Sequence, residues 1–86
     1  MEHTLDGNAA AGMLQAIFPF DMTLVQVTCT GCGATNAIGA TAAYMHGMGT
    51  IIRCPSCDTA LIRVAQVKER YLLDMRGVRV LQMKGG

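Results

Sequence analysis

Hydrophobic residues recur at helical spacing near the start of the chain. Positions i, i+3, i+4, i+7 and i+8 are held by Ala10, Met13, Leu14, Ile17 and Phe18, which places them along one stripe of an α-helix. Such a short helix is marginal in water unless its apolar stripe covers another apolar surface. We therefore predict an N-terminal helix within residues 5–18, packed on the elements that follow it.

The flanking residues define the ends of this helix. Thr4 or Asp6 provides a side-chain oxygen for the N-cap, and Pro19 disfavours helical backbone angles at the residue before it. The helix is expected to run roughly from Asp6 to Ile17, after a frayed start at residues 1–4.

After Asp21 the pattern changes from helical to alternating, which is typical of strands. We predict strands at 23–28, 50–53, 60–68, 71–75 and 78–84, a loosely specified strand or loop at 33–43, and turns at 44–49, at Lys68-Glu69 or Glu69-Arg70, and at Arg76-Gly77. Both faces of the strand at 60–68 are largely apolar, so it is expected to be central in the sheet, with one face available to the helix. The turn at Arg76-Gly77 is expected to close a hairpin, with glycine at a positive φ.

A chain of 86 residues is long enough for one domain, and we assign residues 1–86 to it. The expected fold class is small α+β, mainly β: a helix on an antiparallel sheet, with a ribbon and C-terminal hairpin over residues 22–84. Hydrophobic residues make up 51% of the chain and charged residues 15%. Since no apolar run approaches 18 residues and no secretory signal stands at the start, a cytoplasmic location is expected. The surplus of apolar residues favours a protein partner or a homo-oligomer.

The net charge is only +1, which argues against a dedicated nucleic-acid-binding protein. The charges are nevertheless unevenly distributed. Residues 1–52 carry a net charge of −3 and residues 53–86 a net charge of +4, because all seven Lys and Arg residues lie in the second segment. We interpret these cations as the solvated face of a sheet.

The four cysteines form two C-x-x-C elements separated by 21 residues: Cys29, Cys32, Cys54 and Cys57. Two tight turns of this kind, joined by a hairpin, can converge four thiolates on one tetrahedral cation. Gly31, Gly33 and Asp58 are suited to positive φ angles that turn backbone N–H groups toward the sulfurs. Zn²⁺ in a closed structural site is therefore the expected cofactor, and it would contribute much of the stability of so small a domain.

Other readings of the cysteines have less support. Disulfides need an oxidising compartment, and no secretory signal precedes the cysteines. A dithiol redox motif needs a thioredoxin-like βαβ setting, which 86 residues with two such motifs do not supply. Iron is the runner-up metal, since Cys54-Pro55-Ser56-Cys57 resembles the knuckle of rubredoxins, although those proteins surround the iron with more aromatic residues than this chain offers.

Two further groups contain metal-ligating residue types. His3 behind a free amino terminus can bind Cu²⁺ or Ni²⁺, and Met45, His46 and Met48 form a soft-ligand cluster. We interpret the first as an unstructured terminus and the second as a hairpin tip whose turn is supplied by glycines.

Five short blocks carry a resemblance to a known family. They are Leu5-Asp6-Gly7-Asn8-Ala9 with Gly12 and Leu14, Asp21-Met22-Thr23, Cys29-x-x-Cys32-Gly33, Cys54-Pro55-x-Cys57-Asp58 with Leu61 and Arg63, and Leu73-Asp74-Met75-Arg76-Gly77. Together they resemble a family of uncharacterised small bacterial zinc-ribbon proteins, defined only as a domain of unknown function. The resemblance implies a ribbon with an N-terminal helix, the same four cysteine ligands and no known activity.

A site closed by four cysteines leaves no open position for water or substrate, and the chain has no nucleophile and base set. We therefore expect no enzyme, but a zinc-stabilised protein-interaction module. A nucleic-acid or transcription-associated ribbon is an alternative, based on the basic residues of the C-terminal part. A rubredoxin-like iron electron carrier is another.

Overall fold

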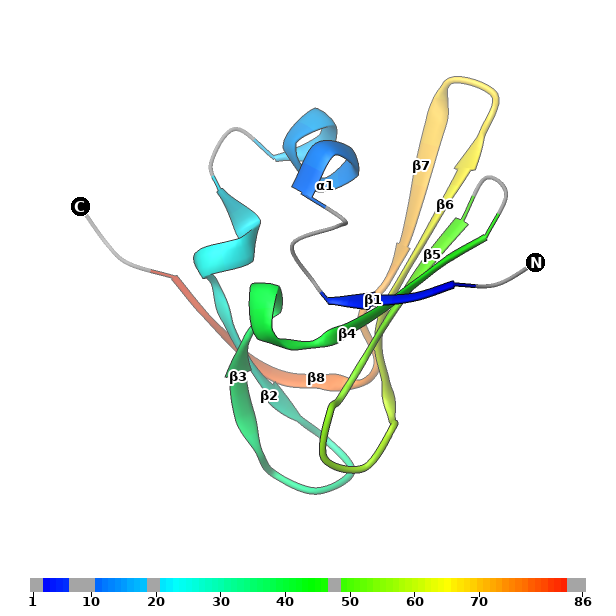
Figure 1. Ribbon diagram of the computed structural model, residues 1–86. Coiled ribbons are helices and arrows are strands. Elements are labelled where there is room, and N and C mark those ends of the chain that lie inside the picture. The colour runs from blue at the N-terminus through cyan, green and yellow to red at the C-terminus, as the bar shows by residue number, and fades with distance from the viewer. Residues whose placement is uncertain (1–2, 7–10, 19–20, 47–48, 84–86) are drawn as a thin grey trace.

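The computed structural model of the chain describes residues 3–6, 11–18, 21–46 and 49–83, which form two antiparallel sheets, one short α-helix and two 3-10 turns (Figure 1). The elements are β1 (His3–Asp6), α1 (Ala11–Ile17), η2 (Met22–Leu24), β2 (Gln26–Cys29), β3 (Thr35–Ala37), η3 (Ile38–Ala40), β4 (Ala42–His46), β5 (Gly49–Arg53), β6 (Ala60–Val67), β7 (Arg70–Asp74) and β8 (Val78–Gln82). The larger sheet has five strands in the order β1-β4-β5-β6-β7, and the smaller has three in the order β3-β2-β8. Within the described ranges, no helix is long and apolar enough to cross a membrane.

The start of the chain differs from the prediction. His3–Asp6 forms strand β1, paired with β4 in the register Thr4↔Tyr44, so residues 3–4 are not a frayed start and Asp6 is not in the helix. The described part of the helix is Ala11–Ile17, and the predicted residues 7–10 lie outside the described part. Residues 3–6 form a strand because they pair with β4, which is distant in the sequence. Strand propensity estimated from neighbouring residues alone does not include such pairing.

The strand that leads to the first cysteines starts later than the predicted residue 23. Met22–Leu24 forms η2 because the Asp21 side chain accepts hydrogen bonds from the Thr23 backbone N–H (3.0 Å) and from the Thr23 hydroxyl (2.6 Å). Strand β2 therefore starts at Gln26. The weakly patterned stretch 33–43 contains β3, η3 and the start of β4.

The turn predicted at 44–49 is shorter in the structure. Tyr44, Met45 and His46 continue β4, and β5 already begins at Gly49. Only residues 47–48, which lie outside the described part, separate the two strands. Tyr44 pairs with Ile51, so its side chain belongs to the sheet rather than to a turn.

The C-terminal strands confirm one expectation and overturn another. Strand β6 lies between β5 and β7, as its two apolar faces predicted, and Lys68-Glu69 forms the turn into β7. The turn at Arg76-Gly77 does not close a hairpin, because β8 leaves the larger sheet and pairs with β2 in the smaller one. Gly77 does not have the predicted positive φ, and its role is a close approach to Ala60 that is described below.

The core lies where the two sheets and the helix meet. Leu14 of α1, Val27 of β2, and Ile52 and Ile62 of the larger sheet are each at most 1% exposed and belong to one hydrophobic cluster. Cys29 and Cys54 belong to the same cluster. The first cysteine of each C-x-x-C element is therefore part of the core.

Candidate metal centre

The two C-x-x-C elements lie side by side at one end of the molecule, in turns that belong to different sheets (Figure 1). Cys29 is the last residue of β2 and Cys32 lies in the turn between β2 and β3 of the smaller sheet, while Cys54 and Cys57 lie in the turn between β5 and β6 of the larger one. The hairpin predicted between the two elements is present as β4 and β5. A cation at this position would link the two sheets directly.

The two turns have the same backbone hydrogen bonds. In the first, the Cys29 N–H donates to the Ala34 carbonyl (2.9 Å) and the Gly33 N–H donates to the Cys29 carbonyl (3.0 Å). In the second, the same two bonds are Cys54 N–H to the Thr59 carbonyl (2.8 Å) and Asp58 N–H to the Cys54 carbonyl (2.9 Å). The fifth residue of each turn, Gly33 or Asp58, has a positive φ of 77° or 67°, as predicted. The two turns are therefore local equivalents.

The sulfur atoms form a compact cluster. All four Sγ atoms lie within 4.8 Å of one another, with Cys29 to Cys57 and Cys32 to Cys54 at 3.6 Å. A regular tetrahedron of sulfurs around Zn²⁺ has edges of about 3.8 Å, given a Zn–S bond of roughly 2.3 Å. The cluster matches this size, whereas a disulfide needs sulfurs about 2.05 Å apart. Its four soft donors therefore fit a tetrahedral metal ion.

The pKa values of the two cysteines in the core are lowered, which favours their thiolate forms. Burial raises the pKa of Cys29, but hydrogen bonds from the backbone N–H groups of Cys32 and Gly31 more than offset it and lower the pKa to about 6. The Gly31 N–H lies 3.2 Å from the Cys29 sulfur. Burial also raises the pKa of Cys54, but hydrogen bonds from the backbone N–H groups of Cys57 and Ser56 lower it, and the net shift is downward. Inward N–H groups thus stabilise negative charge on both buried sulfurs.

Cys32 lies on the exposed side of the cluster and behaves in the opposite way. The backbone N–H of Ala34 favours its thiolate, but the hydrogen bond to the Cys54 sulfur favours its protonated form, and the pKa is raised to about 12. Without a cation the neighbouring sulfurs therefore share protons. A divalent cation removes this competition, because all four sulfurs can bind it as thiolates, which leaves a formal charge of −2 on the centre.

Three contacts around the cluster had no distinct signal in the sequence. The Thr59 hydroxyl lies 3.0 Å from the Cys57 sulfur. Arg53 donates to the Asp58 carbonyl (2.9 Å) and stands over the Tyr44 ring at 5.5 Å, which attaches the second turn to β4. Gly31 lies so close to Thr59 that a Cβ there would be 2.5 Å from the Thr59 hydroxyl oxygen. Sequence reasoning gave Gly31 a positive φ, whereas only Gly33 of the two has one.

A fourth contact joins the turn after β7 to both cysteine turns. The Thr30 N–H of the first turn donates to the Gly77 carbonyl at 2.9 Å. Gly77 also lies against the backbone of Ala60, just after the second turn, with no room for a side chain. Residue 77 is thus a wedge between the two elements that carry the sulfurs.

The other metal-ligating candidates of the sequence are His3, Met45, His46 and Met48. His3 lies in β1 and is paired with Met45 of β4, while His46 ends β4 and Met48 is outside the described residues. In the part of the chain whose side chains are described, the group of His, Cys, Asp or Glu residues that could hold a metal is the four-cysteine cluster.

Comparisons with known proteins give a family but no function. No curated protein and no solved structure matches the chain. A family model covers residues 1–86, the whole length of the chain, and its description is a family of unknown function. The four-cysteine cluster fits the zinc-ribbon character that the sequence blocks indicated. The chain belongs to the family of unknown function DUF6510.

Proposed function

We propose that this protein is a zinc-stabilised, non-catalytic protein-interaction module, in which one Zn²⁺ ion bound by Cys29, Cys32, Cys54 and Cys57 holds two small sheets together. The main support for the proposal is that four sulfur atoms, from turns of two different sheets, all lie within 4.8 Å of one another. Four thiolates occupy all four coordination positions of a tetrahedral zinc ion, so no position remains for a water nucleophile or a substrate. The metal would then act on the fold rather than on a reaction.

The size of the sheets supports a structural role for the metal. The smaller sheet has strands of only three to five residues, and such a sheet is marginal by itself. Structural zinc contributes on the order of 10 kcal/mol to the folding of small domains. Zinc is favoured over iron because few aromatic residues are available to shield the site, and among the described aromatics Tyr44 contacts Arg53 instead.

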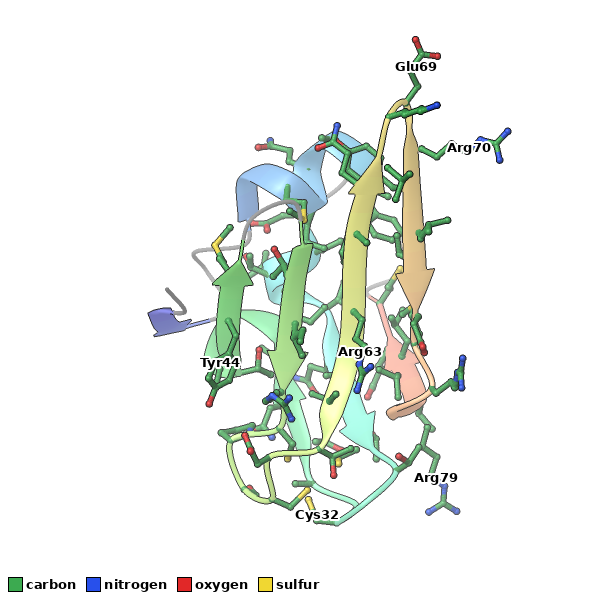
Figure 2. The ribbon with its side chains drawn as sticks, turned by 90° about the vertical axis from the view of Figure 1, so that its right-hand side faces the viewer. Cys32, Tyr44, Arg63, Glu69, Arg70 and Arg79 are labelled. Carbon is green, nitrogen blue, oxygen red and sulfur yellow. The ribbon has the colours of Figure 1, made fainter. Side chains whose placement is uncertain are left out.

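The placement of the basic residues favours a protein partner over a nucleic acid. Arg53 and Arg76 form ion pairs with Asp58 and Asp74. Figure 2 shows Arg70 at the tip of the β6-β7 hairpin and Arg79 at the opposite end of the molecule. Arg70 and Arg79 are thus too far apart to belong to one basic patch, and two other cations already have acidic partners, which argues against a nucleic-acid surface.

Metal analysis and chelation test this proposal. Protein purified without added metal should contain one zinc per chain, and a strong chelator should abolish its folded circular-dichroism signal until zinc is returned. Cys54→Ser should behave like the chelated protein, whereas Ser56→Ala, a change in the same turn at a residue that is not a ligand, should not. A chain that keeps its fold after complete removal of metal would refute the structural role, and a red protein with iron would refute the choice of zinc.

A further inference from the structure

The larger sheet ends in an open edge. Strand β7 is hydrogen-bonded to β6 on one side, and no described strand lies on its other side. Figure 2 shows it as the outermost strand of this sheet. Since backbone groups alternate in direction along an antiparallel strand, every second residue of β7 turns its N–H and C=O groups toward the open edge. Such an edge is a template for another strand.

Apolar side chains are exposed along this edge. Leu72 is 55% exposed, and Tyr71 and Leu73 are each 37% exposed. Val67, opposite Arg70 at the start of the hairpin, is 47% exposed. The devices that usually protect a free edge are missing from β7, since the strand has no proline, no central charge and no bulge in its register with β6. The edge is thus suited to being covered.

The sequence of β7 is complementary to itself. In an antiparallel pair of two copies centred on Leu72, each Arg70 stands opposite Asp74 of the other copy, Tyr71 stands opposite Leu73, and the two Leu72 residues face each other. The ends of the strand therefore pair opposite charges, and its centre pairs apolar side chains. The arrangement has two-fold symmetry, so it closes after two copies instead of growing into a fibre.

The outer face of the sheet continues this apolar strip. A groove of about 340 Å³ is lined by Tyr44, Ile51, Ala65 and Leu72, with the polar Arg63 and Asp74 at its side. Residues Arg63 and Asp74, and Ala65 and Leu72, are direct neighbours across β6 and β7. Joining two copies at β7 would place their grooves next to each other across the two-fold axis and bury both Leu72 side chains.

One contact must change in such a pair. Asp74 forms an ion pair with Arg76 at 3.3 Å, and the Arg76 side chain is 91% exposed. An exposed pair of this kind contributes only about 0–1 kcal/mol. Asp74 can therefore accept Arg70 of a second copy while its other oxygen keeps the hydrogen bond from the Arg76 N–H (3.1 Å).

We propose that the surface presented by this module is the β7 edge, and that its partner is a second copy of the chain, paired antiparallel about Leu72 so that two five-stranded sheets become one continuous sheet. This inference rests on the proposed role as an interaction module and identifies its partner. Because the edge has only five residues, we expect a reversible dimer whose proportion rises with concentration.

Charge reversal tests the partner and the register together. The zinc-loaded protein should sediment as a monomer–dimer equilibrium in analytical ultracentrifugation. Arg70→Glu or Asp74→Lys places like charges opposite each other at both ends of the paired strands, and each should weaken the dimer about tenfold or more. The double variant Arg70→Glu with Asp74→Lys restores opposite charges and should restore the dimer. Arg79→Glu, an exposed cation on β8, is the matched control and should leave the equilibrium unchanged.

Two results would overturn the inference. One is a wild-type protein that stays monomeric at its highest soluble concentration, and the other is a dimer that neither single variant weakens. Circular dichroism and zinc content, measured on every variant, separate these results from misfolding. A protein that needs zinc to fold yet remains a monomer would refute the dimer and leave the structural role of the metal intact, whereas a zinc-independent fold would refute that role alone.

Discussion

The wedge at Gly77 offers a sharp test of how the metal centre is held. A Cβ atom at this position would meet the Ala60 carbonyl group and would lie 2.7 Å from both the Ala60 carbonyl carbon and the Leu61 Cα. Nonbonded carbon atoms prefer about 3.5–4.0 Å, so the two backbone segments would have to separate by roughly 1 Å. All three atoms belong to the backbone, and no side-chain rotation can relieve the overlap. Gly77→Ala must therefore displace the start of β6 or the turn after β7.

The expected cost can be assembled from two contributions. Forced overpacking typically costs about 1–3 kcal/mol. The displacement also strains the hydrogen bond from the Thr30 N–H to the Gly77 carbonyl, which contributes about 1 kcal/mol. We expect Gly77→Ala to lower the free energy of unfolding of the zinc-loaded protein by about 2–4 kcal/mol, a large part of the roughly 5–15 kcal/mol typical of a domain. Zinc affinity should fall as well, because the wedge lies between the two cysteine turns.

Urea unfolding of the zinc-loaded protein and competition with a zinc-binding dye measure the two effects. The matched control is Gly12→Ala in α1, where a Cβ has no heavy atom of the described residues within 4 Å and where alanine favours the helix by up to about 1 kcal/mol. The control should therefore be as stable as the wild type or slightly more stable. If Gly77→Ala unfolds at the same urea concentration as the wild type and binds zinc equally well, the close approach of Gly77 to Ala60 does not stabilise the metal centre.

Three other predictions concern the surroundings of the site and the core. Thr59→Val removes the hydroxyl 3.0 Å from the Cys57 sulfur, so zinc affinity should fall about 10–100-fold in a chelator competition with little change in the circular-dichroism spectrum. Thr50 has a buried hydroxyl with no hydrogen-bond partner among the described residues, so Thr50→Val should raise the free energy of unfolding by about 1 kcal/mol, and a loss of stability would contradict this. Acid should release zinc, because protons compete for the thiolates; the lowered pKa values of Cys29 (about 6) and Cys54 protect these two sulfurs, whereas the raised pKa of Cys32 makes its sulfur the first to take up a proton. A dye that reports free zinc should therefore show release that increases as the pH falls, and zinc binding that does not depend on pH would contradict the assignment.

The clustering of the four cysteines could be predicted from the sequence because the geometry of each C-x-x-C element is local. Two cysteines three positions apart can point their sulfurs at one centre when the turn between them is tight. The positive φ of Gly33 and Asp58 is equally local, since it depends on which residue types tolerate that region. The apolar character of 60–68 also predicted correctly that this strand lies inside the sheet, between β5 and β7.

The sequence by itself thus determined the four sulfurs, their turns and most of the strands, while the tertiary structure decided which strands pair. Residues 3–6 have no strong pattern and became a strand only because β4 offers them an open edge. β8 follows β7 directly, yet it pairs with β2, because Gly77 lets the chain pass close to Ala60 and enter the other sheet. Hydrophobic periodicity reports which face of an element is buried, but it does not report the neighbour that buries it. For that reason only the folded chain reveals that the four-cysteine cluster joins two sheets and that no described strand covers the free edge of β7.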